Sequence, residues 1–160
     1  MTSIIMNLVT FLILASGVFT KAYGQKEKKN IDFVLMVNEE IYAQYNVFKF
    51  ITIKGDKRET MPATYWPGNL SVSEDDYEKI QDSDSVFLDI IDTRYKRKSY
   101  SDQYIIKYRT QWLADTYNIV YIYNLNKKKY ARLYAPSPQG NYVFELDSPG
   151  YTFRIIRKRG

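Results

Sequence analysis

Short runs of β-branched and aromatic residues, separated by polar turns, recur along most of this chain. The clearest example is the stretch 118–135, where NIVYIYNL and KYARLYA flank the polar residues NKK. Two such runs around a short polar turn are typical of a β-hairpin. We therefore predict a hairpin over residues 118–135, with Asn126 and Lys127 as its two-residue turn.

Side chains alternate between the two faces of a strand, so the hairpin defines two sets of residues. One face carries Ile119, Tyr121, Tyr123, Tyr130, Arg132 and Tyr134. The other face carries Val120, Ile122, Ala131 and Leu133, which we expect to face the core. The first set then forms a tyrosine ladder with Arg132 stacked in it, stabilised by contacts of about 0.5–1 kcal/mol each. A three-residue turn would shift the register by one and move Arg132 to the aliphatic face.

The tyrosine ladder has two alternative roles. It is either covered by a second sheet or by the turn at residues 111–116, as strands with two apolar faces usually are, or exposed together with Trp66. An exposed ladder would be a platform for a sugar or a protein, because tyrosine is rigid and half polar.

Other apolar runs predict further short strands with turn signals every ~8–12 residues. We expect these strands at residues 31–37, 41–45, 47–54, 58–65, 86–92, 102–110, 142–146 and 152–157. Pro149 and Gly150 fit the second and third positions of a type II turn between the last two of them. Pro62 cannot donate to a strand ladder, which predicts an edge strand there. Ser73 followed by Asp76 has the form of a capping box and predicts one short helix near residues 74–80. The pattern favours an all-β, antiparallel Greek-key sandwich of roughly eight or nine strands, immunoglobulin-like or transthyretin-like.

The chain begins with an apolar run over residues 4–19, followed by the small residues Ala22 and Gly24. This pattern predicts a signal peptide over residues 1–24, a linker over 25–30 and a single domain over 31–160. The lysines lie after the apolar run and none precedes it, a distribution that the positive-inside rule disfavours for export. An uncleaved anchor and a soluble amphipathic start therefore remain alternatives to the signal peptide. We expect an exported bacterial protein that lies in the periplasm or outside the cell, including the outer surface. It would meet the membrane only through its transient signal peptide.

Composition excludes several kinds of chemistry. The chain has 45% hydrophobic and 16% aromatic residues, enough for a folded core. It contains no Cys and no His, so disulfides, thiol nucleophiles, Ser-His-Asp triads and imidazole metal ligands are all impossible. The net charge is only +5, which favours polyanionic partners weakly. We predict no catalysis, no cofactor and no metal.

Two further patterns could carry function. Basic residues cluster in the loop after the 86–92 strand, next to Tyr95: Arg94, Lys96, Arg97 and Lys98. They either bind an anionic surface or only keep the loop solvated.

The other pattern is a pair of carboxylates, which is all that glycoside hydrolysis needs. A glycoside hydrolase would have two acids roughly 5–9 Å apart in a cleft.

We therefore expect an exported, non-catalytic protein that acts by surface binding, as an envelope, adhesion or secretion-associated component. Its partner would be another protein or an envelope glycan, and we expect no nucleic acid. The first alternative is a carbohydrate- or polyanion-binding module that uses the exposed tyrosines and the basic loop. The second is a carboxylate-based glycoside hydrolase. The sequence leaves the oligomeric state open.

Overall fold

The computed structural model describes residues 27–93, 102–114, 117–136 and 140–155. About 60% of these residues lie in strands and about 16% in helices, which confirms a predominantly β protein. The strands are β1 (Lys28–Val37), β2 (Glu40–Ile41), β3 (Asn46–Lys54), β4 (Lys57–Trp66), β5 (Gly68–Ser73), β6 (Ser85–Asp92), β7 (Asp102–Tyr108), β8 (Asn118–Asn124), β9 (Tyr142–Ser148) and β10 (Tyr151–Phe153). The helical segments are α2 (Glu74–Gln81), the 3-10 helix η1 (Thr110–Ala114) and α3 (Lys128–Leu133).

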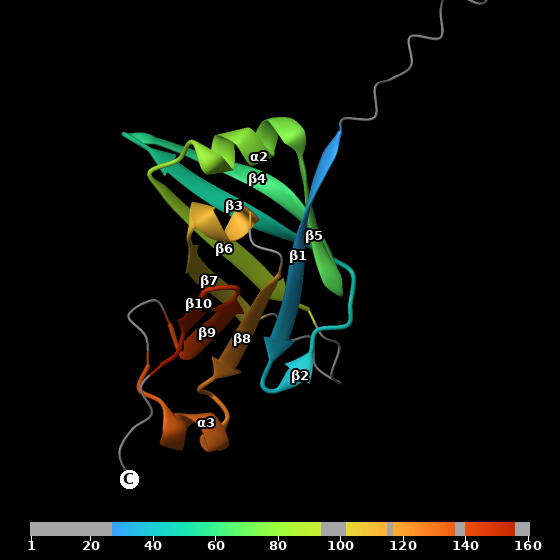
Figure 1. Ribbon diagram of the computed structural model, residues 1–160. Coiled ribbons are helices and arrows are strands. Elements are labelled where there is room, and N and C mark those ends of the chain that lie inside the picture. The colour runs from blue at the N-terminus through green and yellow to red at the C-terminus, as the bar shows by residue number, and fades with distance from the viewer. Residues whose placement is uncertain (1–26, 94–101, 115–116, 137–139, 156–160) are drawn as a thin grey trace, which may run out of the picture.

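All the described strands belong to one sheet with the order β10-β9-β8-β1-β5-β4-β3-β6-β7, and β2 pairs with β1 (Figure 1). The Greek-key sandwich that we expected is not confirmed, because the strands form a single curled sheet. The sheet is also mixed, since β1 and β8 pair in parallel from Phe33 opposite Asn118 to Val37 opposite Ile122. Local turn signals identify hairpins, but they carry no information about such a pairing between distant segments.

The sheet curls where β4 and β5 diverge. β5 pairs with β1 along its whole length, whereas it pairs with β4 only at Thr64–Trp66. Pro62 lies beyond this short pairing and is exposed. Because β4 lies between β3 and β5, the prediction of an edge strand at Pro62 is wrong for the strand as a whole.

Helix α2 follows β5 directly and contacts β1, β3, β5 and η1. Its N-cap is Ser73, as the capping-box pattern predicted: the Asp76 amide donates to the Ser73 hydroxyl oxygen at 3.2 Å. Ile80 is fully buried, and the Tyr77 hydroxyl donates to the Leu113 carbonyl oxygen at 3.4 Å. The prediction of one short helix near 74–80 is therefore confirmed.

The main core lies on the concave inner face of the curled sheet. Inward side chains from both halves of the sheet meet there, including Phe33, Leu35, Phe48, Phe50, Leu88, Ile106, Val120 and Leu146. Tyr142 of β9 holds the edge strand β7 in place. Its hydroxyl accepts from the Ile105 amide at 2.8 Å and donates to the Ile105 carbonyl at 2.7 Å. This contact satisfies backbone groups that an edge strand would otherwise leave free, and it draws β7 against β9.

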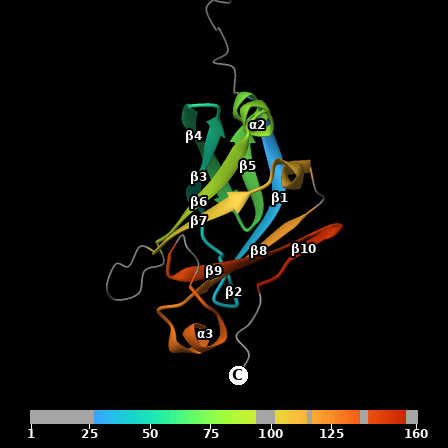
Figure 2. The same cartoon turned by 90° about the vertical axis from the view of Figure 1, so that its left-hand side faces the viewer.

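The predicted hairpin over residues 118–135 is wrong in its second half. Residues 118–124 form β8 as expected, but residues 128–133 form α3. Ala131, Arg132 and Leu133 favour a helix, and Tyr130 and Tyr134 lie four residues apart on one helical face. The true antiparallel partner of β8 is β9. Figures 1 and 2 place α3 at the opposite end of the molecule from α2.

Candidate binding site on the outer face of β8, β9 and β10

The outer face of the sheet, which points away from the main core, carries polar residues on β9. Alternation along β9 directs Leu146 inward and Glu145 and Asp147 outward. Glu145 lies opposite Tyr121 of β8, and Asp147 lies opposite Thr152 of β10. Three strands therefore bring an aromatic ring, two carboxylates and a hydroxyl to one face.

Helix α3 covers one end of this face with a small second core. This core consists of Tyr123, Leu125, Tyr130, Tyr134 and Val143. The ring of Tyr123 stacks on that of Tyr134 at a centroid distance of 5.0 Å and lies 5.3 Å from that of Tyr130. These three tyrosines are buried in a cluster under the helix and do not form an exposed ladder.

Of the predicted binding residues on the tyrosine face, two stay accessible. Tyr121 is half-buried at the edge of the second core, and Arg132 is exposed on α3. Trp66, the last residue of β4, is 56% exposed and packs against Tyr45 at a centroid distance of 4.8 Å. The basic residues predicted to bind anions lie outside the described residues: Arg94, Lys96, Arg97 and Lys98.

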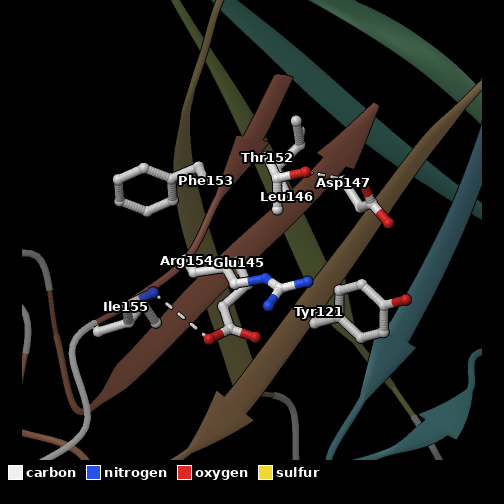
Figure 3. A pocket seen from close by; sticks show the side chains of 8 residues that line it. All are labelled: Tyr121, Glu145, Leu146, Asp147, Thr152, Phe153, Arg154 and Ile155. Carbon is white, nitrogen blue, oxygen red and sulfur yellow. Dashed lines mark hydrogen bonds between the residues drawn. The ribbon is translucent and has the colours of Figure 1, made fainter. Parts of the chain in front are cut away.

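Beside the second core lies an open pocket of about 490 Å³ (Figure 3). Its volume is within the 300–1,000 Å³ typical of small-molecule sites. The pocket is lined by Tyr121, Glu145, Leu146, Asp147, Thr152, Phe153, Arg154 and Ile155. Both cationic and anionic groups line it, so it can donate to and accept from one ligand.

Hydrogen bonds hold the two carboxylates in position. Glu145 accepts from the Ile155 amide at 3.3 Å and from the Tyr123 hydroxyl at 3.4 Å. Asp147 accepts from the Thr152 hydroxyl at 3.1 Å. An ionised carboxylate has about four acceptor positions, so both acids can still accept from a ligand.

The environment also fixes the protonation state of Tyr123. Burial, and secondly the negative charge of Glu145, raise the pKa of the Tyr123 hydroxyl well above its usual value. Tyr123 therefore stays neutral further into the alkaline range than an ordinary tyrosine and remains a hydrogen-bond donor to Glu145.

Sequence reasoning missed the polar residues of this pocket. The Pro149-Gly150 turn was predicted, and it joins β9 to β10 with Tyr151 opposite Ser148. Counting back from that turn puts Asp147 opposite Thr152, and strand alternation adds Glu145 to the same face. The missing information was that β8 lies next to β9, which brings in Tyr121.

Within the described ranges, no group of three or more acids could hold a metal ion. Nor is any helix in the described part of the chain long and apolar enough to cross a membrane.

No protein-family model matches the chain, and no curated protein or solved structure matches it either. A function must therefore be inferred from the residues of the pocket.

Proposed function

We propose that this chain is an exported, non-catalytic protein that binds a carbohydrate in the pocket on the outer face of β8, β9 and β10. One observation carries the proposal: the half-buried ring of Tyr121 lies beside carboxylates, a hydroxyl and a guanidinium in one open pocket. A sugar has an apolar face of C–H groups and a rim of hydroxyls, and each hydroxyl both donates and accepts. The pocket offers a partner for each of these features.

Each side chain has a distinct role in this proposal. The ring of Tyr121 packs against the apolar face of a sugar, while its polar end stays in water. Glu145 and Asp147 accept from sugar hydroxyls, and Arg154 donates to their oxygens. The two acids and one base of the pocket disfavour a strongly anionic glycan, so we expect a neutral one.

The proposal is tested with a glycan array followed by calorimetry on the full chain. We expect a neutral glycan to bind, and Tyr121→Ala to weaken its binding about tenfold, or ~1.4 kcal/mol. The matched control is Tyr45→Ala, which removes an exposed tyrosine just before β3 and should leave the affinity unchanged. An array without neutral glycans among its hits, or equal losses in both variants, would contradict the proposal.

A second candidate function follows from the carboxylate pair. Glu145 and Asp147 are two residues apart on the same face of β9, so their Cα atoms are about 6.5–7 Å apart. A glycoside hydrolase could use such a pair if a cleft held the substrate between them. The distinguishing assay measures release of new reducing ends from the bound glycan. Binding alone predicts none, whereas hydrolysis that disappears in Glu145→Gln and Asp147→Asn would favour the enzyme.

A further inference from the structure

A second cavity lies on the other side of β10, at the seam where edge strand β7 faces β9 and β10. Its volume is about 260 Å³. It is lined by Lys107, Arg109, Trp112, Phe144, Tyr151 and Phe153. Along β10, Thr152 lines the outer pocket and Tyr151 lines the seam cavity, while Phe153 lines both and forms the wall between them.

Aromatic rings form the apolar walls of the seam cavity. The rings of Phe144 and Phe153 have a centroid distance of 5.5 Å, and those of Trp112 and Tyr151 have one of 5.8 Å. Trp112 is only 5% exposed and packs edge-on against Tyr108 of the main core, so the floor is rigid. Phe153 is 39% exposed, which leaves one wall open to a ligand.

Two exposed cations stand at the same cavity. The guanidinium carbon of Arg109 lies 4.8 Å from the Tyr151 ring centroid and 5.8 Å from that of Trp112. These cation–π contacts orient the guanidinium while leaving its N–H groups available. No acidic residue lines the cavity, and among the described residues no carboxylate forms an ion pair with Lys107 or Arg109.

We propose that the seam cavity binds a carboxylate carried on an aromatic or aliphatic group. Arg109 and Lys107 hold the carboxylate, the guanidinium by paired N–H donors, while the apolar group packs against Phe144 and Phe153. The cavity is smaller than the usual range for drug-sized ligands, so it suits one ring or side chain and not an oligosaccharide. This size separates it from the glycan pocket on the outer face.

Two sources could supply such a group: a free small carboxylic acid with an aromatic or aliphatic group, or the C-terminal residue of another protein. The segment 156–160 is a poor occupant, because it carries three cations and no acidic side chain. Charge complementarity therefore favours a ligand from outside the chain.

The test follows tryptophan fluorescence of the full chain. The chain has two tryptophans, so the substitution Trp66→Phe leaves Trp112 as the reporter at the cavity floor. We expect saturable binding of 3-phenylpropionate and of a short peptide ending in phenylalanine with a free carboxylate. The corresponding amides should bind at least tenfold more weakly. If only the peptide binds, the source is a protein C-terminus. If only the small acid binds, the source is a free metabolite. Either result supports the site.

Variants complete the test. Lys107→Gln and Arg109→Gln should each weaken carboxylate binding about tenfold, Arg109→Lys should retain part of it, and the control Lys49→Gln should change nothing. Equal binding of acid and amide, no binding of either acid at millimolar concentration, or an unchanged affinity in both glutamine variants would overturn the proposal. Tyr121→Ala should leave this binding intact, so failure of the glycan site and failure of the seam site can be told apart.

Discussion

The hydroxyl of Tyr142 should contribute measurably to stability, because it joins β9 to the edge strand β7. Tyr142→Phe removes this hydroxyl and keeps the ring, which packs edge-on against Tyr104 at 5.2 Å. Two hydrogen bonds to the backbone of Ile105 are lost, at 2.8 and 2.7 Å. Each such bond contributes about 1 kcal/mol net, and an unsatisfied buried group costs about 1–3 kcal/mol. We therefore expect the free energy of unfolding to fall by about 2 kcal/mol.

Chemical denaturation measures this loss, and hydrogen exchange locates it. The denaturation midpoint should fall with an unchanged slope, and the melting temperature should drop by about 5–10 °C. The Ile105 amide should exchange faster, because its acceptor is gone. Tyr121→Phe is the control, since it removes a half-buried tyrosine hydroxyl outside the main core, and should change stability by less than about 0.5 kcal/mol. A loss for Tyr142→Phe no larger than the control, with unchanged exchange at Ile105, would refute this reasoning.

Two further predictions concern the tyrosines. A Cβ atom at Gly140, where φ is +156°, would lie 2.8 Å from Cε1 of Tyr142. Gly140→Ala should therefore cost about 1–3 kcal/mol by displacing the ring, and its effect should be non-additive with Tyr142→Phe in a double-mutant cycle of unfolding free energies. Simple additivity would show that the two residues act separately. Burial raises the pKa values of Tyr65, Tyr123, Tyr130 and Tyr142 above the usual 10.0. The unfolded chain then loses these protons first, so stability should be complete below about pH 10 and fall above it, by at most about 1.4 kcal/mol per pH unit for each tyrosine. Unfolding free energies at about pH 9 and about pH 11 check this, and equal values would contradict it.

The features that the sequence predicted correctly depend on neighbouring residues. Ser73 and Asp76 form the expected cap, and the Ser73 hydroxyl also donates to the Asp76 carboxylate at 2.6 Å. The turn at Pro149 and Gly150 likewise joins two paired strands. Such signals act over a few residues, so the sequence carries them completely.

The segment 128–134 shows where local reasoning fails. Its residues fit both an alternating strand and a helix with Tyr130 and Tyr134 on one side. Packing of both rings against Tyr123 selects the helix, and that contact is a tertiary one. The parallel pairing of β1 with β8 is equally non-local. The pairing of β8 with β9 places Glu145 opposite Tyr121, and therefore determines where the outer pocket forms.

The proposed binding function is tested most directly by mapping backbone amide shifts of the full chain during titration with the strongest neutral glycan from the array. We predict that the largest shifts occur at Tyr121, Glu145, Asp147 and Thr152, that they disappear in Tyr121→Ala, and that the glycan is recovered intact. Shifts centred on Trp66 and Tyr45, or conversion of the glycan during the titration, would contradict a non-catalytic binding site on the outer face.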